Sequence, residues 1–205
     1  ERELFENARE AAFRIQEIAR QIAMLPGETM DGLREGLLSL EARAAREYWD
    51  ACRQLLAEPT WQSRETRGAT DLVNVLLNYG YGCLYGKIEQ AVLLAGLDPY
   101  AGYVHTDRSG KPSLVLDLIE EFRQPVVDRT VFALLRLGVS FTLEEGRLDP
   151  ASRRRLAEKV EERLDGTAPH EGKHHKLRSI VQMQARRVAT TVRGEATYRP
   201  FVSPW

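Results

Sequence analysis

The sequence is poor in cysteine and holds no long apolar run. Only two cysteines occur among 205 residues, Cys52 and Cys83. Both fall in apolar helical patterns, which predicts reduced core thiols in a cytosolic protein rather than a disulfide framework. No apolar stretch approaches the roughly 20 residues of a membrane-spanning helix. We therefore expect a cytoplasmic location and no membrane partner.

Net charge is nearly absent as well. The chain has 29 Lys and Arg against 30 Asp and Glu, a formal net charge of −1. No global basic excess indicates a nucleic-acid-binding protein, so such a function must rest on local charge. The chain begins at Glu1 without an initiator Met and enters a helical pattern at once. We interpret it as one part of a longer protein, long enough to bury one helical core.

Apolar residues recur at the helical period along most of the chain. Asp31 is the expected N-cap of the second helix, and Gly82 with Gly86 is expected to admit a close neighbouring backbone. No convincing series of strands is present, so the predicted fold class is all-α, one multi-helix domain over residues 1–205 with an extended tail at 198–205. The pattern predicts helices over 1–24, 31–57, 70–94, 113–123 with a continuation to 137 after a kink or break at Pro125, 149–164 and 176–194.

Four residues are candidate metal ligands. Asp117 and Glu120 lie three apart on the predicted fourth helix and so project from one face. An adjacent apolar stripe would dock that helix and partly bury the pair, which favours metal binding or a raised pKa; a solvated acidic edge is the alternative. His105, in the preceding loop, is able to join carboxylates around a divalent ion, or is structural. Glu41 lies in an alanine-rich helix where another helix can pack closely, or forms a surface pair with Arg.

One motif is rejected on physical grounds. Residues 170–174 read His-Glu-Gly-Lys-His and match the H-E-x-x-H pattern of zinc proteases. That chemistry needs a rigid, buried helix that holds both histidines on one face. Here Pro169 precedes the motif, Gly172 interrupts it and no apolar residue lies within it. We interpret it as a polar loop or a frayed helix start.

Basic residues gather in two regions, the loop before the third helix and the C-terminal quarter of the chain. Such clusters can contact phosphates through a sequence-independent electrostatic attraction, although basic helix faces are often merely solvated. The residues concerned are Arg64 and Arg67 in the loop, and Lys173, Lys176, Arg178, Arg186, Arg187, Arg193 and Arg199 near the C-terminus.

Four stretches, in this order and spacing, resemble the Cas1 family of CRISPR-associated proteins: residues 40–49, 67–81, 95–105 and 113–123. The likeness continues at 184–187 and 198–201 and so covers nearly the whole chain. The resemblance implies the α-helical catalytic domain of this family, with the family's N-terminal β-rich domain absent from this chain.

The resemblance also implies a site. The family's metal ligands map onto Glu41, His105, Asp117 and Glu120, although the family often has Asp in place of Glu120. Carboxylates suit Mg²⁺, whereas an imidazole shifts the preference toward Mn²⁺. The basic residues that flank these positions are the expected DNA-binding residues: Arg64, Arg67, Lys111 and Arg123.

The function implied is that of a metal-dependent DNA endonuclease and integrase. It would insert short DNA fragments (spacers) into a CRISPR array by transesterification with a 3′-hydroxyl. The implied partners are double-stranded DNA (prespacer and CRISPR repeat), Cas2, a second copy in a homodimer, and a fused or associated Cas4 or reverse-transcriptase module. Two rival readings are a non-catalytic helical scaffold that binds DNA or protein, and a di-iron carboxylate bundle. The bundle would need Glu-x-x-His pairs on two helices, and no confident helix carries one.

Overall fold

Residues 2–105 and 110–203 are described by the computed structural model, which divides into an N-terminal unit (residues 1–71) and a C-terminal unit (residues 72–205). The expectation of a single domain over the whole chain stays a prediction. Within the described residues, helices dominate and strands are short, which confirms the all-α fold class. No helix in these ranges combines the length and apolarity needed to cross a membrane.

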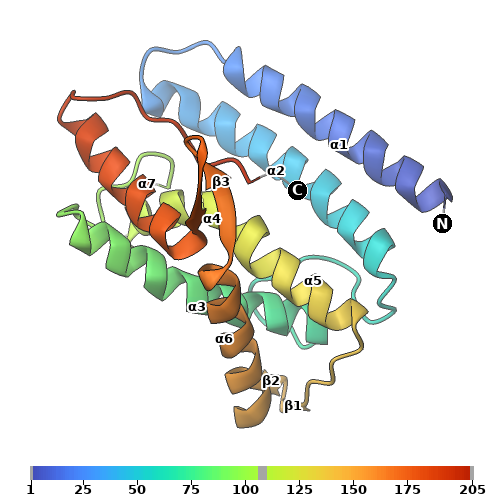
Figure 1. Cartoon of the computed structure of the whole chain (residues 1–205). Coiled ribbons are helices and arrows are strands. Elements are labelled where there is room, and N and C mark those ends of the chain that lie inside the picture. Colours follow the sequence, from blue (N-terminus) through green and yellow to red (C-terminus); the bar gives the residue numbers. More distant parts are fainter. Residues whose placement is uncertain (1, 106–109, 204–205) are drawn as a thin grey trace. The chain divides into compact units, whose positions relative to one another are not determined.

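The N-terminal unit is a hairpin of two long helices, α1 (Arg2–Ala23) and α2 (Met30–Leu56), which lie side by side in Figure 1. Ala11 and Ile18 are the buried residues of α1, and their separation of two turns places them on one face. The predicted N-cap at Asp31 is wrong. Thr29 caps α2 instead, because its hydroxyl accepts the N–H of Gly32 at 3.4 Å.

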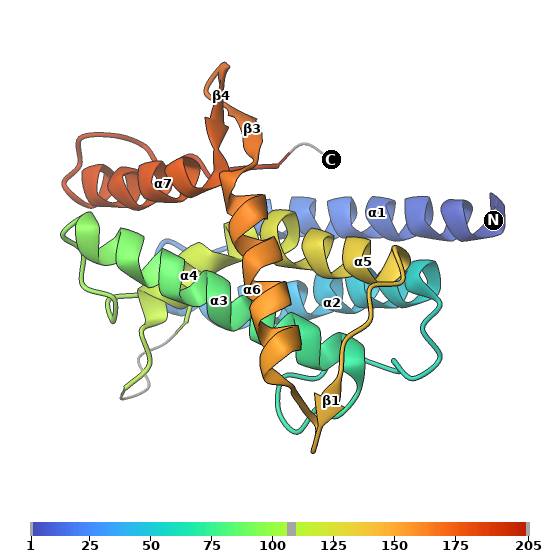
Figure 2. The same ribbon diagram turned by 60° about the horizontal axis from the view of Figure 1, so that its bottom comes forward.

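The C-terminal unit is built around α3 (Leu72–Leu94), which contacts α4 (Ser113–Phe122), α6 (Pro150–Asp165) and α7 (Leu177–Val192). Figure 2 shows α6 crossing α3. Helix α3 is apolar on most sides because several helices cover it. Its fully buried side chains are those of Val73, Leu76, Leu77, Leu84, Ile88 and Val92.

Pro125 widens a helix here and does not break it. Helix α4 runs through a π-helical turn, η1 (Arg123–Asp128), into α5 (Arg129–Arg136). Proline lacks the N–H that an α-helix needs, and a π-turn accommodates its loss.

The expected close approach at Gly82 and Gly86 is wrong, because a Cβ at either would meet no described atom within 4 Å. Gly80 instead admits a close side chain: a Cβ there would lie 2.6 Å from Cγ1 of Val127 in η1.

Two short hairpins were not predicted. Strand β1 (Leu143–Glu144) pairs with β2 (Arg147–Leu148), and β3 (Thr167–His170) pairs with β4 (Lys173–Lys176). Both turns consist of a Glu-Gly pair with positive φ at each residue, which is the geometry of two-residue hairpin turns. Residues 170–174 therefore lie on two strands and a turn, not in a loop or a frayed helix, and lack the helical turn that the zinc-protease pattern requires.

Candidate active site

The loop that carries His105 is fastened to the start of α4. The N–H of Leu114 donates to the carbonyl of Pro99 at 2.9 Å. The Ser113 hydroxyl accepts the N–H of Gly102 at 2.9 Å and donates to the carbonyl of Tyr100. A Cβ at Gly102 would lie 2.6 Å from the backbone carbonyl carbon of Ser113. Only glycine permits so close a crossing of loop and helix.

Asp117 receives four hydrogen bonds from this loop. Its Oδ2 accepts the N–H groups of Tyr103 at 2.5 Å and Val104 at 3.1 Å. Its Oδ1 accepts the N–H of His105 at 3.0 Å and lies 2.7 Å from His105 Nδ1. Burial alone would raise the pKa of Asp117, but the hydrogen bonds from the His105 ring and the loop amides outweigh it and lower that pKa. Asp117 is therefore an ionised carboxylate at neutral pH.

The contact with Asp117 orients the His105 ring. When Nδ1 donates its proton to the carboxylate, the neutral ring carries its lone pair on Nε2. Carboxylate–histidine pairs of this kind fix the ring and raise its basicity at metal sites. The His105 side chain is 34% exposed and that of Asp117 13%, so the pair lies at the surface with the carboxylate on the inner side.

Glu120, one turn further along α4, is engaged by a different partner. Its carboxylate accepts a hydrogen bond from Arg123 at 2.7 Å, and the Arg123 guanidinium lies 4.3 Å from the ring centroid of Tyr81. Burial alone would lower the pKa of Arg123, but Glu120 and Tyr81 outweigh it and raise that pKa. Arg123 is thus tied to a ligand candidate; its predicted contact with DNA stays a prediction.

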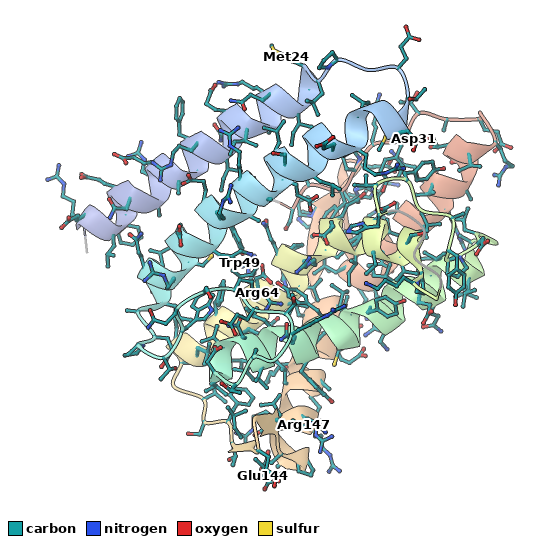
Figure 3. The ribbon with its side chains drawn as sticks, turned by 180° about the vertical axis from the view of Figure 1, so that it is seen from behind. Met24, Asp31, Trp49, Arg64, Glu144 and Arg147 are labelled. Carbon is teal, nitrogen blue, oxygen red and sulfur yellow. The ribbon has the colours of Figure 1, made fainter. Side chains whose placement is uncertain are left out.

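The remaining predicted residues are placed on several elements. Glu41 lies on α2 of the N-terminal unit, so its place in a common site stays a prediction. Arg64 lies with its guanidinium 5.6 Å from the ring centroid of Trp49 (Figure 3), in the same unit. Arg67 and Lys111 are exposed. Among the residues that the structure describes, no three metal-ligating side chains form a cluster; His105 and Asp117 are brought together.

Comparison with known proteins decides the family. Residues 1–162 match the model of the family described as CRISPR associated protein Cas1. This chain belongs to the Cas1 family. It is 37% identical over 217 residues to the CRISPR-associated endonuclease Cas1 1 of Archaeoglobus fulgidus, an alignment that covers 99% of the chain and 63% of that protein. It is 36% identical over 183 residues to a Cas4/Cas1 fusion of Rhodospirillum rubrum, covering 82% of the chain and 32% of the fusion.

Solved structures share the Cas1 fold of this chain at low sequence identity. The Cas1 protein of Thermotoga maritima superposes with a TM-score of 0.80 at 22% identity, over 95% of this chain and 64% of that one. A casposase bound to integration product gives 0.76 at 22% identity, over 98% and 66%. A Cas6-RT-Cas1–Cas2 complex gives 0.76 at 23% identity, over 91% and 21%. The chain spans about three fifths of the length of the Archaeoglobus relative.

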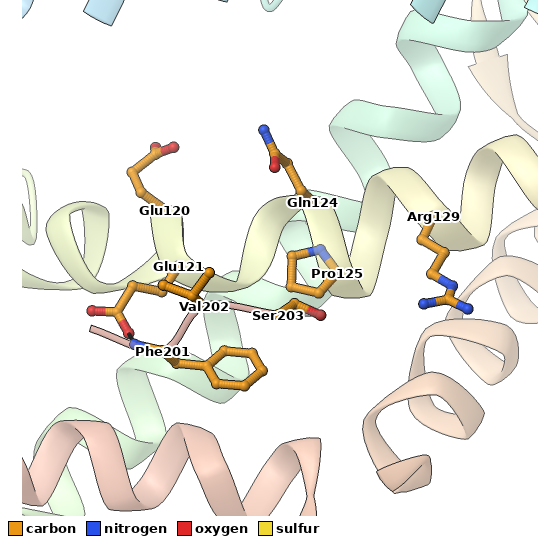
Figure 4. Close-up of a pocket in the computed structure, with 8 residues that line it drawn as sticks. All are labelled: Glu120, Glu121, Gln124, Pro125, Arg129, Phe201, Val202 and Ser203. Carbon is orange, nitrogen blue, oxygen red and sulfur yellow. Dashed lines mark hydrogen bonds between the residues drawn. The ribbon is translucent and has the colours of Figure 1, made fainter. Parts of the chain in front are cut away.

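Sequence reasoning missed one carboxylate in this Cas1 chain. Glu121 accepts hydrogen bonds from Gln184 Nε2 at 2.8 Å, from the Tyr198 hydroxyl and from the N–H of Phe201 at 2.8 Å. Figure 4 shows Glu121 directed toward Phe201, while its neighbour Glu120 points to the other side of the helix. No local pattern marks Glu121, because its three partners follow it by 63 to 80 residues.

Proposed function

We propose that this Cas1 family chain is the helical catalytic part of a metal-dependent DNA endonuclease and integrase. It would insert short DNA fragments into a CRISPR array by transesterification, in which a 3′-hydroxyl attacks a phosphodiester of the repeat. The observation that carries the proposal is the His105 ring held by Asp117 at 2.7 Å. An oriented imidazole on a fixed carboxylate is an arrangement suited to metal binding, and it lies at positions implied by the family resemblance.

The donor set suits Mg²⁺ or Mn²⁺. His105 and Asp117 supply a nitrogen and a carboxylate on adjacent segments, and Glu120 follows one turn later on α4. Glu41 is the proposed further donor from the N-terminal unit. Carboxylates with one imidazole match Mn²⁺ and tolerate Mg²⁺. A divalent ion held by these residues would polarise the scissile phosphate and stabilise charge on the departing oxygen.

The chain's own residues would provide orientation. Asp117 keeps the His105 ring in one orientation and one tautomer, so the ring would not need to reorganise when a divalent ion binds. To serve as a metal ligand, the Glu120 carboxylate would have to leave its contact with Arg123. Without a bound ion, the contact with Arg123 compensates the negative charge of Glu120 near Asp117.

DNA is the proposed substrate and partner. Arg64, Arg67 and Lys111 would contact backbone phosphates, and Arg123 would do so only after it leaves Glu120. The solved casposase bound to integration product, which shares this fold, supports the DNA substrate. Cas2 and a reverse-transcriptase module are proposed partners, supported by the Cas6-RT-Cas1–Cas2 complex, and Cas4 by the Rhodospirillum fusion. A homodimer is proposed from the family resemblance alone.

A strand-transfer assay tests the function. The protein, Mn²⁺ and a short duplex with 3′-hydroxyl ends are incubated with a plasmid that carries a CRISPR repeat, and joined products are counted. His105→Ala should reduce joining by at least about 100-fold, a typical loss for an essential catalytic group. His174→Ala, an exposed histidine of β4, should retain full activity. Equal joining activity in parent and His105→Ala would contradict the assignment of His105, and no joining by the parent would favour a non-catalytic scaffold.

A further inference from the structure

Glu121 lies on the same α4 helix as the proposed ligands and points to the other side of the helix from Glu120 (Figure 4). It follows Glu120 directly and stands one full turn after Asp117. Its carboxylate is held by the C-terminal part of the chain: Oε1 accepts a hydrogen bond from the Tyr198 hydroxyl, and Oε2 accepts from Gln184 and from the N–H of Phe201. Three hydrogen bonds to a half-buried carboxylate hold it in one position.

The donors belong to two separate segments. Gln184 lies on α7 and is fully buried, and its amide also donates to the carbonyl of Arg199 at 3.0 Å. Tyr198 and Phe201 belong to the extended tail that follows α7. Burial and the Glu121 carboxylate raise the pKa of Tyr198, so its hydroxyl keeps the proton that it donates. One carboxylate thus joins α4 to α7 and to the tail.

An aromatic stack reinforces this junction. Phe201 is 4% exposed, and its ring stacks on that of Phe122 at a centroid distance of 5.5 Å and an interplanar angle of 14°. Phe122 is the last residue of α4, directly before the π-turn. The tail therefore holds the end of α4 at the point where the regular hydrogen-bond ladder of the helix is lost.

Two cavities adjoin the junction of the tail with α4. A cavity of about 200 Å³, lined by Glu121, Pro125 and Phe201 among others, lies on one side of the junction (Figure 4). A second cavity, of about 570 Å³ and mostly apolar, is lined by Asp117, Glu121 and Tyr198 among others. Glu121 lines both cavities, so loss of its hydrogen bonds is not made good by neighbouring atoms.

We propose that Glu121 is a positioning residue: with Gln184, Tyr198 and Phe201 it forms a clasp that fixes α4, and thereby the spacing of Asp117 and Glu120 relative to His105. The inference rests on the proposed metal-dependent function. It gives the C-terminal tail a role in the site that acts through Glu121. Supporting residues of this kind typically change metal affinity by about 10-fold to 100-fold.

Two variants and one control test the clasp. Glu121→Gln replaces one acceptor oxygen by an amide that faces N–H donors. Tyr198→Phe removes a single hydroxyl and keeps the ring. Glu162→Gln removes a charge from an exposed ion pair on α6. For each protein, amide hydrogen exchange of residues 113–122 and the Mn²⁺ dissociation constant are measured at a temperature at which all are folded.

In Glu121→Gln we expect faster amide exchange in α4 and about 10-fold weaker Mn²⁺ binding. In Tyr198→Phe both quantities should change less, and in Glu162→Gln neither should change. A merely structural role would speed exchange and leave the affinity for Mn²⁺ unchanged, and that result would overturn the inference. Unchanged exchange in both variants would overturn it as well. A parent chain that binds no Mn²⁺ would overturn the proposed function together with this inference, whereas equal Mn²⁺ binding by parent and variants overturns the inference alone.

Discussion

His105 Nδ1 lies 2.7 Å from Oδ1 of Asp117, and the same carboxylate accepts the backbone N–H groups of three consecutive loop residues, 103–105. One side chain therefore fixes both the orientation of the ring and the path of the loop that carries it. The two functions are coupled, so a substitution at Asp117 is expected to change stability and metal binding together.

The stability of the loop depends on the charge of Asp117. In Asp117→Asn, an amide group would face N–H donors whichever way the side chain is turned. Because hydrogen bonds to a charged group contribute about 1.5–3 kcal/mol, we expect a loss of about 2–3 kcal/mol in the free energy of unfolding. Urea denaturation at neutral pH measures it, with Glu162→Gln as the exposed acidic control. A loss no larger than that of the control would contradict the role of the loop contacts.

The same contacts predict a pH dependence. The pKa of Asp117 in the folded chain is below the ordinary value of 3.8, so its contribution to stability is complete above that value and is lost as the pH falls through the folded pKa. The difference in unfolding free energy between the parent and Asp117→Asn should shrink as the pH falls below about 4. A difference that stays constant into strong acid would show that the carboxylate is not stabilised by folding.

The crossing at Gly102 should tolerate no side chain. Gly102→Ala would place Cβ at 2.6 Å from the backbone of Ser113, and relief of such overpacking costs about 1–3 kcal/mol. Gly82→Ala, in α3 with no described atom within 4 Å of the new Cβ, is the matched control. It should stabilise the helix by roughly 0.5–1 kcal/mol. The two melting temperatures should move in opposite directions, and a shift in the same direction would refute the close crossing.

Substitution of Arg123 tests whether this residue supports the fold or contacts DNA. If its guanidinium serves Glu120 and Tyr81, Arg123→Gln should lower stability by about 1–3 kcal/mol, the range for a partly buried charged contact, and leave the salt dependence of DNA binding unchanged. Arg67→Gln and Lys111→Gln should instead keep stability and each lower the salt slope by about 0.9. Titration of a duplex at several salt concentrations, with thermal melts of the same proteins, separates the two patterns.

Metal binding tests whether the predicted ligands act together. Calorimetric titration with Mn²⁺ should show one site in the parent, with binding lost in His105→Ala and in Asp117→Ala. Chelation of the ion should abolish strand transfer in the parent and leave its helical content unchanged. If His105→Ala keeps the Mn²⁺ affinity of the parent, His105 is not a metal ligand. If Asp117→Ala keeps it, Asp117 fixes the loop but does not bind the metal.

Periodicity and spacing in the sequence determined the helices and part of the site. Apolar residues at the helical period placed α1 to α7 within a few residues, because burial of one face is encoded locally. The separation of Asp117 and Glu120 placed both on one helix for the same reason. The Cas1 resemblance, carried by four local stretches, gave the family that the comparison with known proteins confirmed. The two Glu-Gly hairpins were missed because two-residue and four-residue strands are too short to show a period of two.

Only the tertiary structure decided how the side chains are used. It paired His105 with Asp117 and tied Arg123 to Glu120. It also made Gly80 and Gly102 the positions of close approach in place of Gly82 and Gly86. It also turned Glu121 from an unremarked acid into the junction of α4 with the tail. These contacts join residues that are distant in the chain or depend on side-chain direction. Local periodicity carries no information on either, because both are set by the packing of separate helices.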